Sequence, residues 1–238
     1  MALPPFHMAA LTKIALGILI LAGAFLAILW MGLLPNALSP LSPLSLAKRD
    51  QRFVDAKLAM LRFDPALCQG VLEPRYVDAA FRPDRTLKEG CGWTNSVGFT
   101  QIGGARMHVH ALTCEMTAAL ALWIKYEVQP TAISLFGSPV AKVDHLGSYS
   151  CRNIAGRQSR SQHAMVNAID VSGFTLKNGR KISVLRHWQA NSAESKFLRI
   201  DFFVGNERSQ CDLFALAFYL DLRAFLACRA VAPTGPRN

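Results

Sequence analysis

The feature that most constrains this chain is an apolar run over residues 14–34 that contains no charged residue. A helix of about 20 apolar residues is long enough to cross the hydrocarbon core of a bilayer. A secretory signal peptide is the alternative, because Lys13 supplies a basic start, but its apolar region is about 7–15 residues long and precedes a small-x-small cleavage site. The run is longer, and no convincing cleavage site follows it. We therefore expect an uncleaved transmembrane helix at 14–34 after a short cytoplasmic tail at 1–13.

A spacer follows the apolar run. Residues 35–52 contain Pro35, Pro40 and Pro43 among serines, which favours extended chain over regular structure. The remainder, 53–238, is expected to form one domain. In a chain of 238 residues with 51% hydrophobic and 18% charged content, there is material for one real core and no room for a second large domain.

The charge balance narrows the possible partners. The formal net charge is +10, which favours an anionic neighbour such as a phospholipid surface or the carboxylates of a cell wall. Nucleic acid is the competing partner. We expect none, because the basic residues are scattered and no DNA- or RNA-reading motif is present.

The chain has an even number of cysteines and no Cys-x-x-Cys pair, which favours disulfides over zinc or thioredoxin-like chemistry. Disulfides imply an oxidising compartment such as the periplasm, and six buried thiols in the cytosol are the alternative. Six cysteines allow 15 pairings, and proximity alone favours Cys68 with Cys91. The six are Cys68, Cys91, Cys114, Cys151, Cys211 and Cys228.

The chemically most informative string is Ser161-x-His163-x-x-x-x-Ala168-x-Asp170. It delivers an imidazole and a carboxylate to the start of an apolar-alternating run, and both are ligand types that suit zinc. The alternative is a core histidine with satisfied hydrogen bonds and a turn aspartate.

A third metal ligand is predicted from a hairpin. Asn178-Gly179 lies between two β-compatible runs, which is typical of a two-residue type I′ turn. In that register the numbers of paired residues sum to 357, so Asp170 lies opposite His187 and the two side chains share one face. His187 then approaches a metal held by His163 and Asp170; the alternative is a surface histidine.

Two further segments bear on the fold and on metal binding. Residues 114–128 predict a central buried helix that begins after Thr113 as N-cap and stops at Pro130. His108 and His110 alternate on a predicted strand, so their imidazoles face the same way and are a second candidate metal pair.

Residues 66–200 resemble the extensin-like C-terminal domain of bacterial proteins, whose relatives include lysostaphin-type and D-Ala-D-Ala-cleaving zinc peptidases and the hedgehog fold. The resemblance rests on motifs in a fixed order. They are Gly90-Cys91-Gly92, Leu112-Thr113-Cys114-x-Met116, Gln129-Pro130, Gly147-Ser148-Tyr149-Ser150-Cys151-Arg152-Asn153, His163 to Asp170, and Val184-Leu185-Arg186 before Trp188.

This resemblance implies an α+β fold with a small antiparallel sheet and packed helices, acting on peptidoglycan in the periplasm of a bacterium, at the inner membrane. His163 and Asp170 would be zinc ligands, and Arg152 would be a catalytic residue that holds the oxyanion of a peptide carbonyl. A ligand role for His187 would be particular to this chain.

The sequence also departs from the family. Val166 stands where the wider zinc motif has glycine, and the family's final His-x-Asp-His-Phe-His stretch is absent after Arg199. Either the site has lost part of its ligands, or the tail derives from a frameshifted reading. The sequence therefore predicts a membrane-anchored zinc peptidase with an incomplete site, or a non-catalytic wall-binding domain of the same fold.

Overall fold

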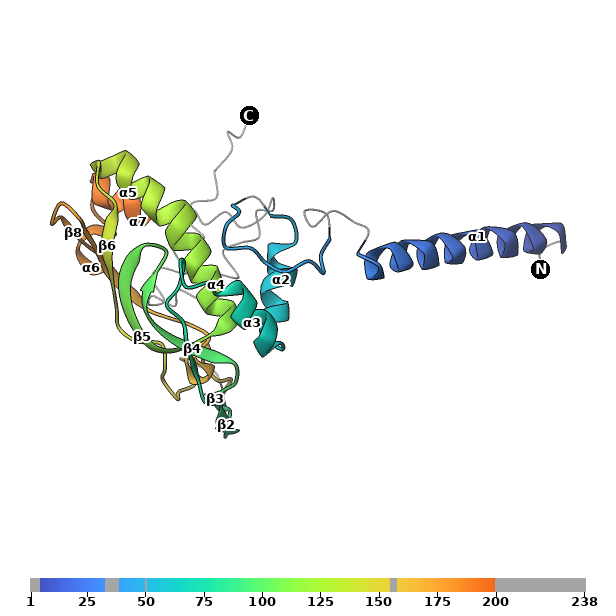
Figure 1. The fold of residues 1–238 in the computed structure, drawn as a ribbon, viewed down its shortest axis with the longest axis horizontal. Helices are drawn as coiled ribbons and strands as arrows, with labels where there is room; N and C mark the ends of the chain where they lie inside the picture. The colour runs from blue at the N-terminus through green and yellow to red at the C-terminus, as the bar shows by residue number, and fades with distance from the viewer. Residues whose placement is uncertain (1–4, 33–38, 50, 155–157, 200–238) are drawn as a thin grey trace, which may run out of the picture. The chain divides into compact units, whose positions relative to one another are not determined.

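The fold is that of a computed structural model, which describes residues 5–32, 39–49, 51–154 and 158–199 (Figure 1). The chain divides into two compact units, residues 1–43 and 44–238. The boundary falls inside the predicted spacer at 35–52.

The first unit contains one helix, α1 (Pro5–Trp30), in its described part. The described side chains of α1 are mostly exposed. Among the residues that the structure describes, no helix meets the length and hydropathy of a membrane span. The transmembrane helix predicted at 14–34 is therefore not found in the described residues; residues 33–34 of that prediction lie outside them.

The second unit is built on a mixed six-stranded sheet with the strand order β1-β4-β5-β6-β7-β8. Neighbouring strands run antiparallel except for β5 and β6, which are parallel. The predicted α+β class is confirmed, but the expected small, purely antiparallel sheet is wrong. The parallel pair arises because the long helical segment between β5 and β6 returns the chain to the starting edge. The strands are β1 (Ala80–Arg82), β4 (Ser96–Ile102), β5 (Ala105–Thr113), β6 (Val140–His145), β7 (Val171–Leu176) and β8 (Lys181–Ser183).

Strand β5 shows how the sequence forms the core. Its side chains alternate between buried and exposed from Ala105 to His110, so one face of the strand packs inward. The outward residues Arg106, His108 and His110 leave the other face to solvent.

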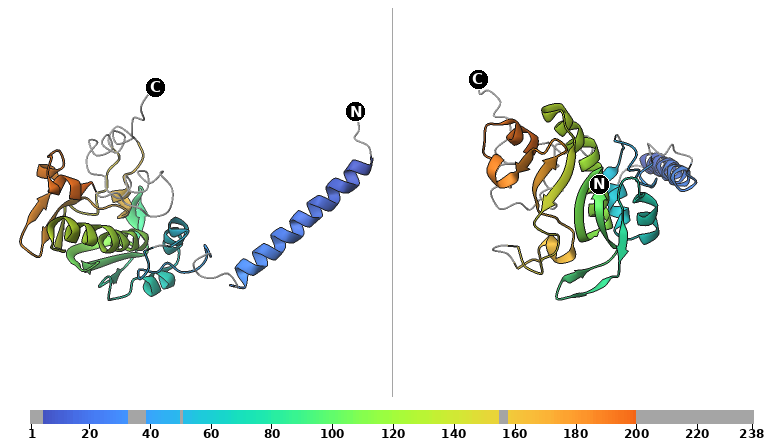
Figure 2. Two further views of the ribbon diagram at one scale, coloured as in Figure 1. Left: turned by 90° about the horizontal axis from the view of Figure 1, so that it is seen from above. Right: turned by 60° about the vertical axis from the view of Figure 1, so that its left-hand side comes forward.

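A long helical rod lies along this sheet (Figures 1 and 2). It consists of α4 (Cys114–Trp123), the π-helical turn η1 (Ile124–Val128) and α5 (Gln129–Phe136). Every residue of α4 is buried except Glu115, which confirms the predicted central helix. Thr113 caps it, accepting a hydrogen bond from the Met116 N–H at 3.3 Å.

The predicted stop at Pro130 is only partly right, because η1 ends at Val128 but α5 follows directly at Gln129. Pro130 lies in the first turn of α5, where a proline is tolerated because the missing N–H needs no helical partner. The wider turn of η1 immediately before it lets the rod continue.

Aromatic rings pack the rod against β7, and β7 against the last described helix. The Phe174 ring of β7 lies 6.2 Å from the Trp123 ring and 5.1 Å from the Phe197 ring, centroid to centroid. Phe197 belongs to α7 (Ala193–Leu198) and is fully buried. The core therefore spans the sheet, α4 and α7.

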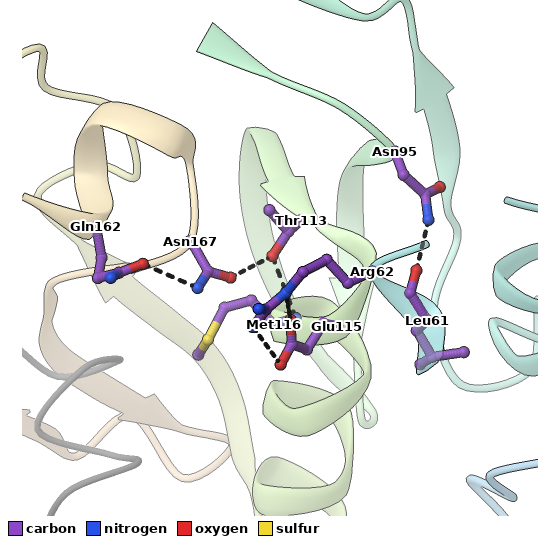
Figure 3. Close-up of polar contacts among 8 residues, drawn as sticks. All are labelled: Leu61, Arg62, Asn95, Thr113, Glu115, Met116, Gln162 and Asn167. Carbon is purple, nitrogen blue, oxygen red and sulfur yellow. Dashed lines mark hydrogen bonds and ion pairs between the residues drawn. The ribbon is translucent and has the colours of Figure 1, made fainter. Parts of the chain in front are cut away.

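Two short helices cover the start of the rod, α2 (Val54–Leu61) and α3 (Pro65–Val71). A disulfide joins Cys68 of α3 to Cys114, the first residue of α4. Arg62, just after α2, makes a bidentate ion pair with Glu115 at 2.8 and 3.0 Å (Figure 3).

A separate two-stranded sheet of β2 (Arg85–Lys88) and β3 (Cys91–Trp93) completes the described fold. The disulfide Cys91–Cys151 ties β3 to the segment after β6. The structure thus confirms disulfides, but Cys68 does not pair with Cys91 as predicted from proximity, because each cysteine meets a partner distant in sequence. Cys211 and Cys228 lie outside the described residues.

The hairpin of β7 and β8 exists, but its predicted register is wrong. Gly173 pairs with Ser183 and Phe174 with Ile182, so paired numbers sum to 356 instead of 357. The Leu176 N–H donates to the Arg180 carbonyl, which closes a three-residue loop that ends at Gly179 with φ +87°. A type I′ turn needs positive φ at both central residues, and Asn178 does not have it.

Candidate functional site

The site begins in a short 3₁₀ turn, η2 (Gln162–Met165). Ser161 caps this turn, and its hydroxyl accepts a hydrogen bond from the His163 N–H at 3.4 Å. The turn ends at Val166, whose backbone is left-handed with φ +47°. The chain then passes through Ala168 and Ile169, both fully buried, to Asp170, which immediately precedes β7.

The structure brings His163 and Asp170 together. The His163 Nε2 atom lies 3.4 Å from the Asp170 Oδ1 atom, and the two side chains are 3% and 21% exposed. Both atoms are buried, and neither has a hydrogen-bond partner among the described residues. Buried polar atoms without partners are rare and costly in proteins, and each requires an explanation.

The separation of these two atoms fits a shared zinc ion. A hydrogen bond between nitrogen and oxygen is usually 2.7–3.2 Å long. Two ligands bound at zinc distances in a tetrahedral arrangement are about 3.3–3.5 Å apart. The donor set, one imidazole and one carboxylate, is also of the kind that zinc takes. At 3.4 Å the two atoms are also close enough for an ion pair when His163 is protonated. A cation between them would account both for the distance and for the missing hydrogen-bond partners.

Neighbouring polar groups hold the loop between His163 and Asp170 (Figure 3). Asn167 accepts a hydrogen bond from the Thr113 hydroxyl at 2.6 Å and donates one to the Gln162 side chain at 3.1 Å. The Thr113 N–H also donates to the Val166 carbonyl at 3.0 Å. The cap of the central helix therefore positions the loop that carries His163.

Arg152, the predicted catalytic residue, is exposed and lies on a segment tied to the same loop. The Ser150 N–H donates to the His163 carbonyl at 3.1 Å, and the Ser161 N–H donates to the Arg152 carbonyl at 3.0 Å. The Cys91–Cys151 disulfide fixes the residue next to Arg152. The backbone of Arg152 is thereby held beside the loop, while its side chain reaches solvent.

The structure does not bring His187 to the pair. Strand β8 ends at Ser183, and His187 lies in the following short helix, α6 (Val184–His187). Its Nδ1 atom accepts a hydrogen bond from the Ser183 N–H at 3.0 Å. Across the described ranges no three His, Cys, Asp or Glu side chains gather closely enough to hold a metal. The hairpin alignment that placed His187 opposite Asp170 is therefore wrong.

The other candidates lie elsewhere. His108 and His110 are exposed on the outward face of β5, and the His108 carbonyl accepts a hydrogen bond from His145 Nε2 at 2.7 Å. Glu194 of α7 is a carboxylate that could act as a base, but it forms an ion pair with Arg180 at 2.6 Å. Its own backbone N–H and Ser192 hold the pKa of Glu194 below its usual value, and Arg180 adds to this.

Sequence reasoning missed the support given by Thr113, Asn167 and Gln162. Thr113 was predicted only as a helix cap, and its second bond to Asn167 joins positions 54 residues apart. No local pattern signals such a contact, although both residues belong to the ordered motifs of the extensin-like domain.

The fold and the site together define an α+β domain, braced by two disulfides, that carries a buried histidine–carboxylate pair. The family model described as "Extensin-like protein C-terminus" matches residues 66–217, which is more than half of the chain. The chain therefore belongs to this family. No curated protein and no solved structure matches it.

Proposed function

We propose that this extensin-like domain is a zinc-dependent peptidase that acts on the peptides of a bacterial cell wall. One observation carries the proposal: the buried His163 Nε2 and Asp170 Oδ1 atoms face each other at 3.4 Å without another partner. The resemblance to zinc peptidases and the membership of the extensin-like family support the same chemistry.

The residues present fit zinc as far as the described chain reaches. His163 and Asp170 would hold the ion, and bound zinc would supply a Lewis acid for attack on a peptide carbonyl. Arg152 would donate hydrogen bonds to the carbonyl oxygen as negative charge builds on it. Catalytic zinc sites use three protein ligands, and the described residues supply two.

The same two-donor set supports a second candidate, a non-catalytic domain that binds cell-wall peptide. Two protein ligands hold zinc less firmly than three, and the family's His-x-Asp-His-Phe-His stretch is absent from this sequence. In that case the fold would present Arg152 and its neighbours to a peptide without cleaving it.

An oxidising compartment is part of the proposal. The disulfides Cys68–Cys114 and Cys91–Cys151 support it, because such bonds persist in the periplasm and are rare in the cytosol. The net charge of +10 suits the anionic wall found there.

The test is a cleavage assay with a synthetic wall pentapeptide ending in D-Ala-D-Ala. The full chain is assayed with added zinc, with a chelator, and as the variants His163→Ala and Arg152→Gln. A peptidase releases product only with zinc, loses activity in His163→Ala, and keeps its metal but loses about 100-fold or more in kcat in Arg152→Gln. If the zinc-loaded chain binds the peptide without cleaving it, the non-catalytic candidate replaces the peptidase.

A further inference from the structure

A cluster of one arginine and two aromatic rings lies next to the candidate site. The Trp93 and Tyr149 rings meet edge to face, with centroids 5.3 Å apart. The guanidinium carbon of Arg85 lies 5.3 Å from the Trp93 centroid and 5.2 Å from the Tyr149 centroid. We call these three residues the Arg85 cluster. Because two rings contact it, the Arg85 guanidinium is held in place although the residue is exposed.

The backbone around the Arg85 cluster lets strands β2 and β3 lie close together. A side chain at Gly92 would come within 2.5 Å of the Arg85 carbonyl oxygen, so β2 and β3 can lie this close only with glycine there. The Trp93 indole N–H donates to the Pro83 carbonyl at 3.2 Å, which fixes the ring. The second glycine of the Gly90-Cys91-Gly92 motif therefore serves to build the Arg85 cluster.

The cluster adjoins the loop of His163. Tyr149 precedes Ser150, whose N–H donates to the His163 carbonyl at 3.1 Å. Strand β3, which carries Trp93, packs against η2, which carries His163. A peptide bound at the histidine–carboxylate pair would therefore have the Arg85 cluster beside it.

The arginines in this part of the fold lack acidic partners. Within the described ranges, the arginines that form ion pairs are Arg49, Arg62, Arg75 and Arg180. Arg85 and Arg152 form no ion pair with another described residue, and Arg160 bonds to the Glu89 carbonyl and the Asn153 side chain. The nearby carboxyl of Asp84 accepts the Asn95 N–H and forms no ion pair with an arginine in the described part of the chain. Among the described residues, no ion pair therefore neutralises these arginines, although Asp84 and Glu89 lie in the same segment.

We propose that the Arg85 cluster is a subsite that binds a carboxylate of the wall peptide. A guanidinium donates two parallel hydrogen bonds to a carboxylate, and restraint by the rings reduces the entropy lost on binding. This inference rests on the proposed function for the identity of the peptide. It adds a recognition residue, Arg85, that neither the motifs nor the family match assigned.

A glycan ligand fits the cluster less well. Sugars stack on free aromatic faces, whereas the guanidinium of Arg85 lies over both rings. Trp93 and Tyr149 also meet edge to face at 79°, so they do not form one flat platform. The group that the cluster offers to a ligand is therefore the cation.

The test measures binding of two probes by calorimetry, in the presence of a chelator so that neither metal nor cleavage contributes. The first probe is L-Ala-γ-D-Glu-L-Lys-D-Ala-D-Ala with free carboxylates, and the second is the same peptide with its carboxylates amidated. The full chain is compared with Arg85→Gln, Arg85→Lys and the control Arg106→Gln. Arg106 is also exposed and lies near the start of β5, so the control removes the same charge away from the cluster.

The subsite predicts that Arg85→Gln weakens binding of the free acid by about 10- to 100-fold. The affinity of Arg85→Lys for the free acid falls between those of the unmodified chain and Arg85→Gln, because lysine keeps the charge but lacks the planar fork. Arg106→Gln binds as the unmodified chain does, and the amidated peptide binds weakly to every form.

The inference is overturned if Arg85→Gln and Arg106→Gln behave alike, if the amidated peptide binds as tightly as the free acid, or if the free acid does not bind at millimolar concentration. These results are independent of the peptidase proposal. Arg85-dependent binding without zinc-dependent cleavage would support the subsite and reject the peptidase. Zinc-dependent cleavage that Arg85→Gln does not affect would support the peptidase and reject the subsite.

Discussion

Val166 has a backbone conformation that its side chain disfavours. Four non-glycine residues in the described chain have positive φ, and Val166 alone among them is β-branched. A left-handed backbone costs an ordinary residue about 1–2 kcal/mol, and branching at Cβ adds crowding. The related zinc motif has glycine at this position. The strain therefore lies inside the loop that joins His163 to Asp170.

We predict that Val166→Gly is more stable to urea than Val166→Ala, by about 1 kcal/mol. Both variants lose the buried side chain, but only glycine relieves the left-handed strain. The matched control is Val109, which is equally buried in β5. There glycine should be the less stable of the two substitutions, as in any ordinary strand. If alanine were the more stable substitution at Val166 as well as at Val109, Val166 would store no strain.

Asp78 gives a pH-dependent prediction. Burial pulls the pKa of Asp78 upward, but hydrogen bonds from Thr100 and Gln101 outweigh it and hold the pKa below its usual value. The folded state therefore favours the ionised carboxyl. This stabilisation is present above the unfolded-state pKa of about 3.9 and is lost as the pH falls through the lower folded-state value.

Asp78 is exposed, so solvent screens its carboxyl, and Asp78→Asn should lower the free energy of unfolding by only about 0.5 kcal/mol at pH 7. The deficit should shrink as the pH is lowered below about 4. Urea titrations of both proteins between pH 3 and pH 7 measure it. A deficit that is constant over this range would mean that the carboxyl charge does not contribute.

Single residues were predictable where one local motif contained them. His163 and Asp170 lie within one short string, and the structure places them face to face. His187 and the Cys68–Cys91 pairing depended on long-range register or on mere proximity, and both were wrong. Asn167 was missed because its partner Thr113 lies on another element.

Secondary-structure elements were predictable where hydrophobic pattern alone decides them. The buried helix at 114–128 and the hairpin around Asn178-Gly179 both occur. The errors lie at their ends, because a π-helical turn carries the chain through Pro130 and a three-residue loop shifts the hairpin by one position. Neither the turn nor the loop length is encoded in the alternation of apolar residues.

The Cys68–Cys114 disulfide joins α3 to the first residue of the central helix across 46 residues of sequence. Closing a loop of that length stabilises a fold by about 4 kcal/mol in the chain-entropy description. We predict a loss approaching that size in the double variant Cys68→Ser, Cys114→Ser, measured by urea unfolding under non-reducing conditions.

The matched comparison is the double variant Cys91→Ser, Cys151→Ser. It removes a loop of similar length, 60 residues, but this loop holds the segment of Arg152 and the strand of the Arg85 cluster. It should lose stability and also peptide binding, whereas the first variant should retain peptide binding under conditions in which it is folded. Equal peptide binding by both double variants would show that the Cys91–Cys151 disulfide does not contribute to the peptide site.

For the whole molecule, the fold class and the family were predictable from ordered motifs, and the arrangement of the sheet was not. Motifs such as Gly90-Cys91-Gly92 and the string from His163 to Asp170 are short and local. The parallel contact of β5 with β6 depends instead on the path of a long helical connection. The six-stranded sheet therefore emerged only with the structure.

The central claim is that the whole fold converges on a metal held by His163 and Asp170. The most direct measurement is the zinc content and zinc affinity of the full chain, after dialysis against buffered zinc, compared with His163→Ala, Asp170→Asn and the control His187→Ala. The account predicts about one zinc per chain in the unmodified protein and in His187→Ala, and loss of that zinc in the other two variants. Absence of zinc from the unmodified chain, or equal zinc in all four proteins, would contradict it.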